Sequence, residues 1–322
     1  MIENERIGRA AKHGSQEFLR SAEHYRDTQR VTELESLPPG SLLSPERIHA
    51  VQDVESAIAG FAAEQLSIDI TPRLLPVSQG NIRFYDATDY EQTARTLGIP
   101  GKQRGFTTVT GFIGVEETGD EGSTLITTQH ELVHRLAVRQ SAMWSDDERD
   151  VVSMGNWRSG VSTPGRFGVV DEAIVIELTR KVKDEQWPHY ESLAPFANAT
   201  EPGISTMANM GEGEFDNGIV YCALFEAMCQ RASELTGKDL EKAFYTMHFN
   251  GNRTALHDLS QAFDNRAVTA ISRLSIHTFK SSDILNLANM MGVKDEFMGR
   301  LADYKKVAVG GNDSLSFKKP HH

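Results

Sequence analysis

The chain has 322 residues and carries 33 Lys and Arg against 45 Asp and Glu, which gives a formal net charge of −12. Proteins that bind nucleic acids need a basic face to neutralise phosphates, and the cations here occur only in short mixed groups, so that class is excluded. An apolar content of 39% and an aromatic content of 8% exclude a disordered chain and indicate an ordinary globular protein.

The N-terminal residues 1–6 are charged and polar, without the apolar run of a signal peptide. No stretch approaches the ~20 apolar residues of a membrane span. We therefore expect no membrane span and, by default, a cytoplasmic protein, with export by a route lacking a cleavable signal left open. Cys222 and Cys229 lie two helical turns apart, about 10.5 Å, whereas bridged Cα atoms lie within about 7 Å of each other. They are expected to be core residues.

Residues 1–70 are predicted to form an N-terminal helical extension. Its first 40 residues are polar, and read as a loosely attached helical arm or a linker that ends in a Pro-Pro-Gly breaker. A helix then begins well, because Ser44 is a good N-cap and Pro45 fits the first helical position. Apolar residues at helical spacing carry this helix to about residue 65.

Short extended pieces follow, and predict strands at 73–75 and 82–85. A helix of about two turns is expected over 90–97, ended by a glycine and a proline. Residues 105–115 are rich in β-branched and aromatic side chains and punctuated by glycines, which predicts a strand or hairpin.

The next helix is predicted to begin at Ser123, its expected N-cap, and to run to residue 136. The connection 141–168 is rich in Ser, Gly and charged residues and is predicted to be a solvated loop. Its acidic residues match no calcium-loop spacing. A second helix is expected over 171–182. The remaining predicted helices cover 219–235, 240–249, 254–263, 267–274, 282–291 and 294–301.

Strands thus gather before residue 116 and helices after it, which is typical of an α+β arrangement. We expect one main domain over residues 71–304. Residues 305–322, with their Gly pair and terminal His pair, are predicted to be a flexible tail.

The sharpest local signal is His130-Glu131-Leu132-Val133-His134, which fits H-E-x-x-H. Residues four apart on a helix share one face, so that both imidazoles can bind one Zn²⁺. Zinc lowers the pKa of a bound water to about 7, and an adjacent carboxylate can take its proton as the water attacks a carbonyl. Glu131 is the candidate general base.

A catalytic zinc uses three protein ligands and one open position. The H-E-x-x-H motif followed by Asp171-Glu172-Ala173 at the start of a helix resembles the gluzincins, a family of zinc peptidases. The resemblance covers about residues 75–265 and implies Glu172 as the third ligand, with Glu177 left as an alternative. It also implies a zincin-like fold, in which a small N-terminal sheet region packs on the active-site helix and a mostly helical C-terminal half follows.

The chain departs from that family at two points. Glu172 follows His134 by 38 positions, which implies an inserted loop over the site. Ile176 stands where thermolysin-like members carry the Asp that orients a zinc histidine, and the candidates for that task are Asp171 and Glu177.

Gluzincins also supply a Tyr or His that stabilises the oxyanion. Tyr221 is the leading candidate, because it follows a glycine- and acid-rich loop at residues 211–218 that can build a cleft wall. Tyr190, His189 and His248 compete with it for this role.

The sequence therefore predicts zinc-dependent hydrolysis of peptide bonds in a peptide or protein substrate. Residues 111–115 are expected to align the substrate backbone. An endopeptidase is favoured, because no distinct motif for capturing a free amine is visible. Two alternatives stay open: a zinc-binding effector or binding module with little proteolysis, and an assembly role in which residues 1–70 act as a pro-segment or partner arm. The sequence does not specify the oligomeric state.

Overall fold

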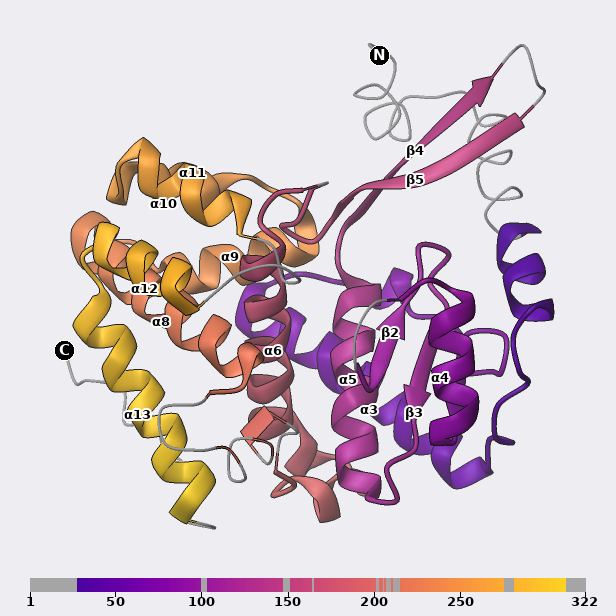
Figure 1. Cartoon of the computed structure of the whole chain (residues 1–322). Coiled ribbons are helices and arrows are strands. Elements are labelled where there is room, and N and C mark those ends of the chain that lie inside the picture. Colours follow the sequence, from indigo (N-terminus) through magenta and orange to yellow (C-terminus); the bar gives the residue numbers. More distant parts are fainter. Residues whose placement is uncertain are drawn as a thin grey trace.

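A computed structural model describes most of the chain as a mixture of many helices, one three-stranded sheet and one separate two-stranded hairpin (Figure 1). The sequence-based expectation of a small sheet followed by a helical C-terminal half is confirmed at this level. The described residues are 28–99, 103–146, 151–163, 165–200, 203, 204, 206, 210, 215–274 and 281–310. Residues 1–27, 211–214 and 311–322, on which parts of the predicted extension, cleft wall and tail fall, lie outside this set.

Helix α3 (Pro45–Leu66) begins as expected, because the Ser44 side chain accepts a hydrogen bond from the backbone N–H of Arg47. Its apolar face lies in the same core as helices α5 and α6, described below. Glu55 on this face forms an ion pair with Arg135, and the two side chains are 6% and 4% exposed. Helix α3, which the sequence analysis assigned to the N-terminal extension, therefore belongs to the same core as α5 and α6.

The small sheet contains β1 (Ile82–Tyr85), β2 (Gly105–Thr107) and β3 (Ile113–Glu116), in the order β1-β3-β2. Strand β1 pairs with β3 in parallel, and β2 pairs with β3 antiparallel. The predicted strand at 73–75 is wrong: a 3₁₀ turn (Thr71–Arg73) stands there, started by Pro72, and Pro76 lacks the N–H that a ladder needs.

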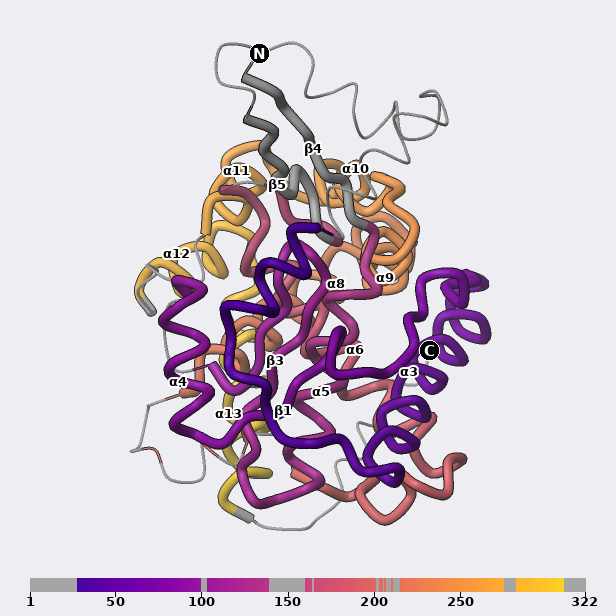
Figure 2. Tube along the Cα trace, turned by 90° about the vertical axis from the view of Figure 1, so that its right-hand side faces the viewer, coloured from indigo at the N-terminus to yellow at the C-terminus, as the bar shows by residue number. Residues whose placement is uncertain are grey.

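The two faces of this sheet pack in different cores. One face, with Phe84 and Val115, joins the core that contains α3. The other, with Tyr85 and Phe106, joins a smaller cluster with helix α4 (Ala87–Thr96). Figure 2 accordingly shows α3 and α4 on opposite sides of β1 and β3.

Helices α5 (Glu121–Leu136) and α6 (Gly168–Gln186) lie side by side between the sheet and the helical half (Figure 1). The N-cap of α5 is Asp120, which accepts from the N–H of Gly122, rather than the predicted Ser123. Asp120 is favoured over Ser123 as the N-cap because its carboxylate also complements the positive end of the helix dipole.

The connection between these helices is not the irregular loop that the sequence indicated. It contains an antiparallel hairpin of β4 (Arg139–Asp146) and β5 (Val151–Ser159), with a register shift at Gln140/Ser141. The sequence did not predict these strands because Ser, Gly and charged residues interrupt the apolar periodicity that marks a strand. Backbone pairing with a partner strand does not require that periodicity. Part of the acidic cluster, residues 147–150, lies outside the described residues.

The C-terminal half is helical, as predicted. It follows two 3₁₀ turns, η2 (Trp187–His189) and η3 (Ala194–Phe196). Its helices are α8 (Asn217–Thr236), α9 (Leu240–Asn250), α10 (Thr254–Ala262), α11 (Asn265–Arg273), α12 (Ser281–Met290) and α13 (Lys294–Gly310). Among the described residues, none of the helices has the length and apolar character needed to cross a membrane.

Helix α13 continues to Gly310, beyond residue 304, where the predicted main domain ends. The buried Tyr304 anchors it: its hydroxyl donates to Glu177 Oε1 at 3.2 Å and to Glu226 Oε1 at 2.8 Å. Lys305 donates to the carbonyl of Met210. These contacts tie the last helix to α6 and α8.

Candidate metal centre

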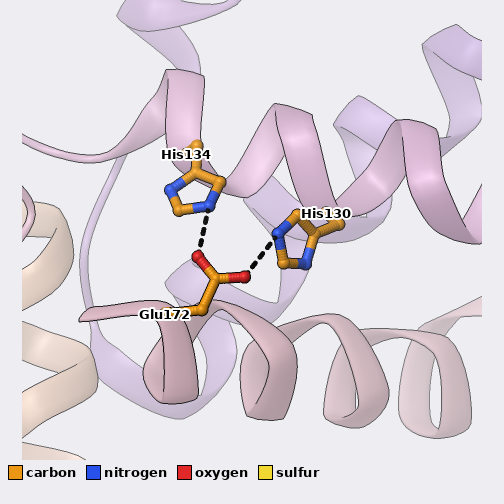
Figure 3. A group of neighbouring side chains, drawn as sticks. All are labelled: His130, His134 and Glu172. Carbon is orange, nitrogen blue, oxygen red and sulfur yellow. Dashed lines mark ion pairs between the residues drawn. The ribbon is translucent and has the colours of Figure 1, made fainter. Parts of the chain in front are cut away.

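Three side chains that the sequence selected converge at one point between α5 and α6 (Figure 3). His130 and His134 project from one face of α5, and Glu172, the fifth residue of α6, projects toward both of them. His130 Nε2 lies 3.3 Å from Glu172 Oε1, and His134 Nε2 lies 3.4 Å from Glu172 Oε2. One ligand atom from each residue can be chosen so that all three lie within 4.8 Å of one another.

Zn–N and Zn–O bonds of about 2.0–2.2 Å place neighbouring ligand atoms of a tetrahedron about 3.3–3.6 Å apart. The two imidazole-to-carboxylate distances of 3.3 and 3.4 Å are similar, but they run to different oxygens of Glu172, and the three ligand atoms taken together lie within 4.8 Å of one another. Two neutral imidazole nitrogens and one carboxylate are also the donor set that zinc accepts. The residues present therefore fit the metal that the motif implies.

The site is accessible from solvent. The side chains of His130, His134 and Glu172 are 22%, 21% and 26% exposed, so that they are partly exposed rather than part of the core. Partial exposure suits a catalytic zinc site, which needs a position for water and substrate.

The three side chains are strongly coupled electrostatically. Burial lowers the pKa of His134, but the hydrogen bond and negative charge of Glu172 outweigh this effect and raise that pKa to about 9. Burial raises the pKa of Glu172, but the charges and hydrogen bonds of the two imidazoles lower it by more. The pKa of this carboxyl is therefore well below its usual range. The negative charges of Glu172, Glu131 and Asp171 thus favour a positive charge at His134.

Glu131 lies on the sheet side of α5, and edge strand β2 holds it there. Its carboxylate Oε2 accepts a hydrogen bond of 2.8 Å from Thr107 Oγ1, which also approaches the Glu131 carbonyl at 3.0 Å. The residue is only 6% exposed. Gly105 leaves the room that this side chain occupies, because a Cβ at that position would stand 2.8 Å from Glu131 Cγ and 2.9 Å from Oε1. Two residues of β2 therefore set the position of the candidate base.

The alternative ligand Glu177 is wrong. It lies five residues beyond Glu172 along α6 and forms an ion pair with Arg180, while its Oε1 accepts from Tyr304. Five residues turn a helix by about 140° from the starting face. Glu177 therefore belongs to the contact between α6 and α13, and this removes it also as the group that orients a zinc histidine.

Asp171 faces other partners than the ligands on α5. Its Oδ1 accepts from the backbone N–H of Val161 at 2.8 Å and lies 3.2 Å from His248 Nδ1. Asp171 is thus part of the support beneath the site, with His248 as its side-chain partner.

Tyr221, the leading oxyanion candidate, lies on α8 and is 4% exposed. Burial and the negative charges of Glu172 and Asp216 raise the pKa of its hydroxyl, which keeps it protonated. The three competitors lie on other elements than α8. Tyr190 is near α3, where the charges of Asp53 and Glu64 raise its pKa together with burial. His248 is fully buried, and His189 lies in the turn η2.

The expectation that residues 111–115 align a substrate is corrected. Most of this segment is β3, which is the central strand, and its two sides are taken by β1 and β2. The strand at the edge of the sheet next to α5 is β2. If a peptide adds to this sheet, it adds along β2.

No family model, curated protein or solved structure matches this chain. The gluzincin resemblance therefore rests on the two motifs alone, and the geometry of the site carries any functional argument.

Sequence reasoning missed Gly105 and Thr107, and it named His248 only as an oxyanion candidate, not as a partner of Asp171 and Val133. Gly105 and Thr107 carry a weak signal, because small residues alternate along a predicted strand just before the motif. His248 carries none, since it lies 115 positions from its partner Val133.

Proposed function

We propose that this protein is a zinc-dependent peptidase of the gluzincin type, with a zincin-like arrangement of sheet and active-site helix. The observation that carries the proposal is the convergence of His130, His134 and Glu172, whose ligand atoms lie within 4.8 Å of one another, beside a glutamate on the helix of the two histidines. We assign the three residues as metal ligands and Glu131 as the general base.

When bound, Zn²⁺ supplies Lewis acidity, which activates a water and polarises the scissile carbonyl. Glu131 Oε2 already accepts a hydrogen bond from Thr107 Oγ1. We therefore assign Oε1 to take the proton of the attacking water and then to deliver it to the leaving amine nitrogen. Tyr221, protonated over a wide pH range, is assigned to donate a hydrogen bond to the developing oxyanion.

A peptide substrate suits this site because β2 is an edge strand beside the base. An extended backbone that pairs with β2 would bring a carbonyl toward the side of α5 that carries Glu131. The same mode accepts the interior of a chain, which favours an endopeptidase over an enzyme that needs a free terminus.

Turnover of a fluorescently labelled unfolded casein by the full chain tests the proposal. We expect the zinc-loaded wild type to cleave it, chelator treatment to abolish cleavage, and added Zn²⁺ to restore it. Glu131→Gln is expected to keep its zinc and to lose at least about 100-fold in kcat. Glu121→Gln, on the same helix but paired with Arg47 far from the site, is the matched control and is expected to retain activity.

Equal turnover in the wild type, Glu131→Gln and chelator-treated samples would overturn the peptidase proposal. A wild type that binds one Zn²⁺ tightly and cleaves neither casein nor a peptide library would instead favour the zinc-binding effector or binding module.

A further inference from the structure

His248 is a polar side chain in the middle of an apolar core. It lies on α9 with no exposed surface, between Met247 and Phe249, which are equally buried. Burying an imidazole without hydrogen bonds is unfavourable by a few kcal/mol, so a core histidine requires partners. An apolar residue would fill the same position without this requirement.

The two ring nitrogens of His248 meet both motif helices. Nδ1 lies 3.2 Å from Asp171 Oδ1 on α6, and Nε2 lies 3.3 Å from the carbonyl oxygen of Val133 on α5. Asp171 immediately precedes Glu172, and Val133 immediately precedes His134. One side chain on α9 thus spans the two chain segments that carry the metal ligands assigned above.

The backbone around this bridge is also tied together. The His248 carbonyl accepts from Val138 N–H at 2.9 Å, and the Val138 carbonyl accepts from Gly160 N–H at 2.9 Å. Gly160 has a φ of +57°, and a Cβ there would overlap both Asp171 and the imidazole. The next residue, Val161, donates to Asp171. Both ends of the β4–β5 hairpin are therefore fastened to the same bridge.

Apolar contacts alone leave two packed helices free to slide by fractions of an ångström, whereas hydrogen bonds are directional and restrict such motion. Metal sites require ligand positions accurate to a few tenths of an ångström. We propose that His248 is a positioning residue for the metal centre, which holds the α5 segment of His134 and the α6 turn of Glu172 at the separation that Zn²⁺ requires. This inference rests on the proposed zinc site but concerns metal affinity rather than catalysis.

Two substitutions test the bridge. His248→Leu fills a similar volume and removes both polar contacts; both partner atoms are acceptors, so a neutral imidazole, which has one N–H, donates to one of them. His248→Asn retains a shorter side chain with an amide that can donate to Asp171. Phe244→Leu is the matched control, because Phe244 is a fully buried residue of the same helix whose ring packs on Phe225 of α8.

Zinc affinity is measured by competition with a chromophoric chelator on the full chain, and urea unfolding of the metal-free protein gives stability. The visible absorption spectrum of the Co²⁺-loaded protein reports ligand geometry. We expect His248→Leu to bind Zn²⁺ about 10-fold more weakly or worse and to change the Co²⁺ spectrum, as supporting residues around metal ligands do. His248→Asn is expected to fall between it and the wild type. Phe244→Leu is expected to lose stability with zinc affinity and spectrum unchanged.

Wild-type zinc affinity and an unchanged Co²⁺ spectrum in both His248 variants would overturn the inference. So would an equal loss of affinity in Phe244→Leu, because the effect would then follow stability alone. If His248→Leu does not fold, the comparison of His248→Asn with Phe244→Leu decides. A wild type that binds no zinc would overturn the proposed function itself, which separates that failure from failure of the bridge.

Discussion

Gly105→Ala is the most direct test of how the sheet controls the candidate base. The substitution adds one methyl group, which would stand 2.8 Å from Glu131 Cγ and 2.9 Å from both Glu131 Oε1 and Thr127 Cγ2. Carbon atoms in contact lie about 3.5–4.0 Å apart, so the Glu131 side chain must move by about 0.7–1.0 Å. Gly105 has no left-handed φ, so that alanine introduces no backbone strain and the effect comes from the contact alone.

A displacement of about 1 Å at a catalytic group lowers the rate by about 100-fold. We expect kcat for casein cleavage to fall by about 10- to 100-fold in Gly105→Ala, with one zinc still bound, because the ligands lie on other faces and elements. Gly299→Ala is the matched control: its Cβ meets open space on α13, and activity is expected to be unchanged. Full kcat in zinc-loaded Gly105→Ala, or loss of zinc from it, would refute this account of β2.

Three further predictions concern other parts of the molecule. Tyr221→Phe removes the assigned oxyanion donor, and we expect kcat to fall by about 100-fold with zinc content unchanged, as measured by metal analysis and casein turnover. Glu55→Ala leaves Arg135 as an uncompensated buried charge next to His134, and we expect a loss of about 3–5 kcal/mol in the free energy of urea unfolding. Burial and the charge of Glu177 raise the pKa of Glu226 to about 7, so that the folded protein holds this proton more tightly than the unfolded chain does. The free energy of unfolding contributed by this group is therefore full below pH 4.5 and falls as the pH rises toward 7, by on the order of 3 kcal/mol. We expect Glu226→Gln to show a flatter stability profile than the wild type between pH 5 and 8, and equal slopes would contradict this.

The three candidate metal ligands were accessible from the sequence because their geometry is local. His130 and His134 are four apart on one helix, and the helix of Glu172 begins with a recognisable run of residues. The long C-terminal helices were likewise visible from their apolar spacing, because each helix buries one face against its neighbours.

The residues that support the site were not accessible, because their roles arise from contacts between distant segments. Thr107 and Glu131 are 24 positions apart, and which strand lies against α5 depends on the order β1-β3-β2. The hairpin β4–β5 depends on backbone pairing that no local pattern announces. Glu177 was a plausible ligand by type, and only the rotation of α6 directs it toward Tyr304.

The fastening of the hairpin has a consequence for how this chain tolerates changes in length. The chain leaves the site at Val138 and returns at Gly160, and these two residues are joined by a backbone hydrogen bond. Although Glu172 follows His134 by 38 positions, most of this segment is therefore a loop whose two ends are held together. Doubling such a loop costs only about 0.6 kcal/mol of closure entropy. The hairpin is thus a position where segments can be shortened, extended or exchanged while the ligands keep their places.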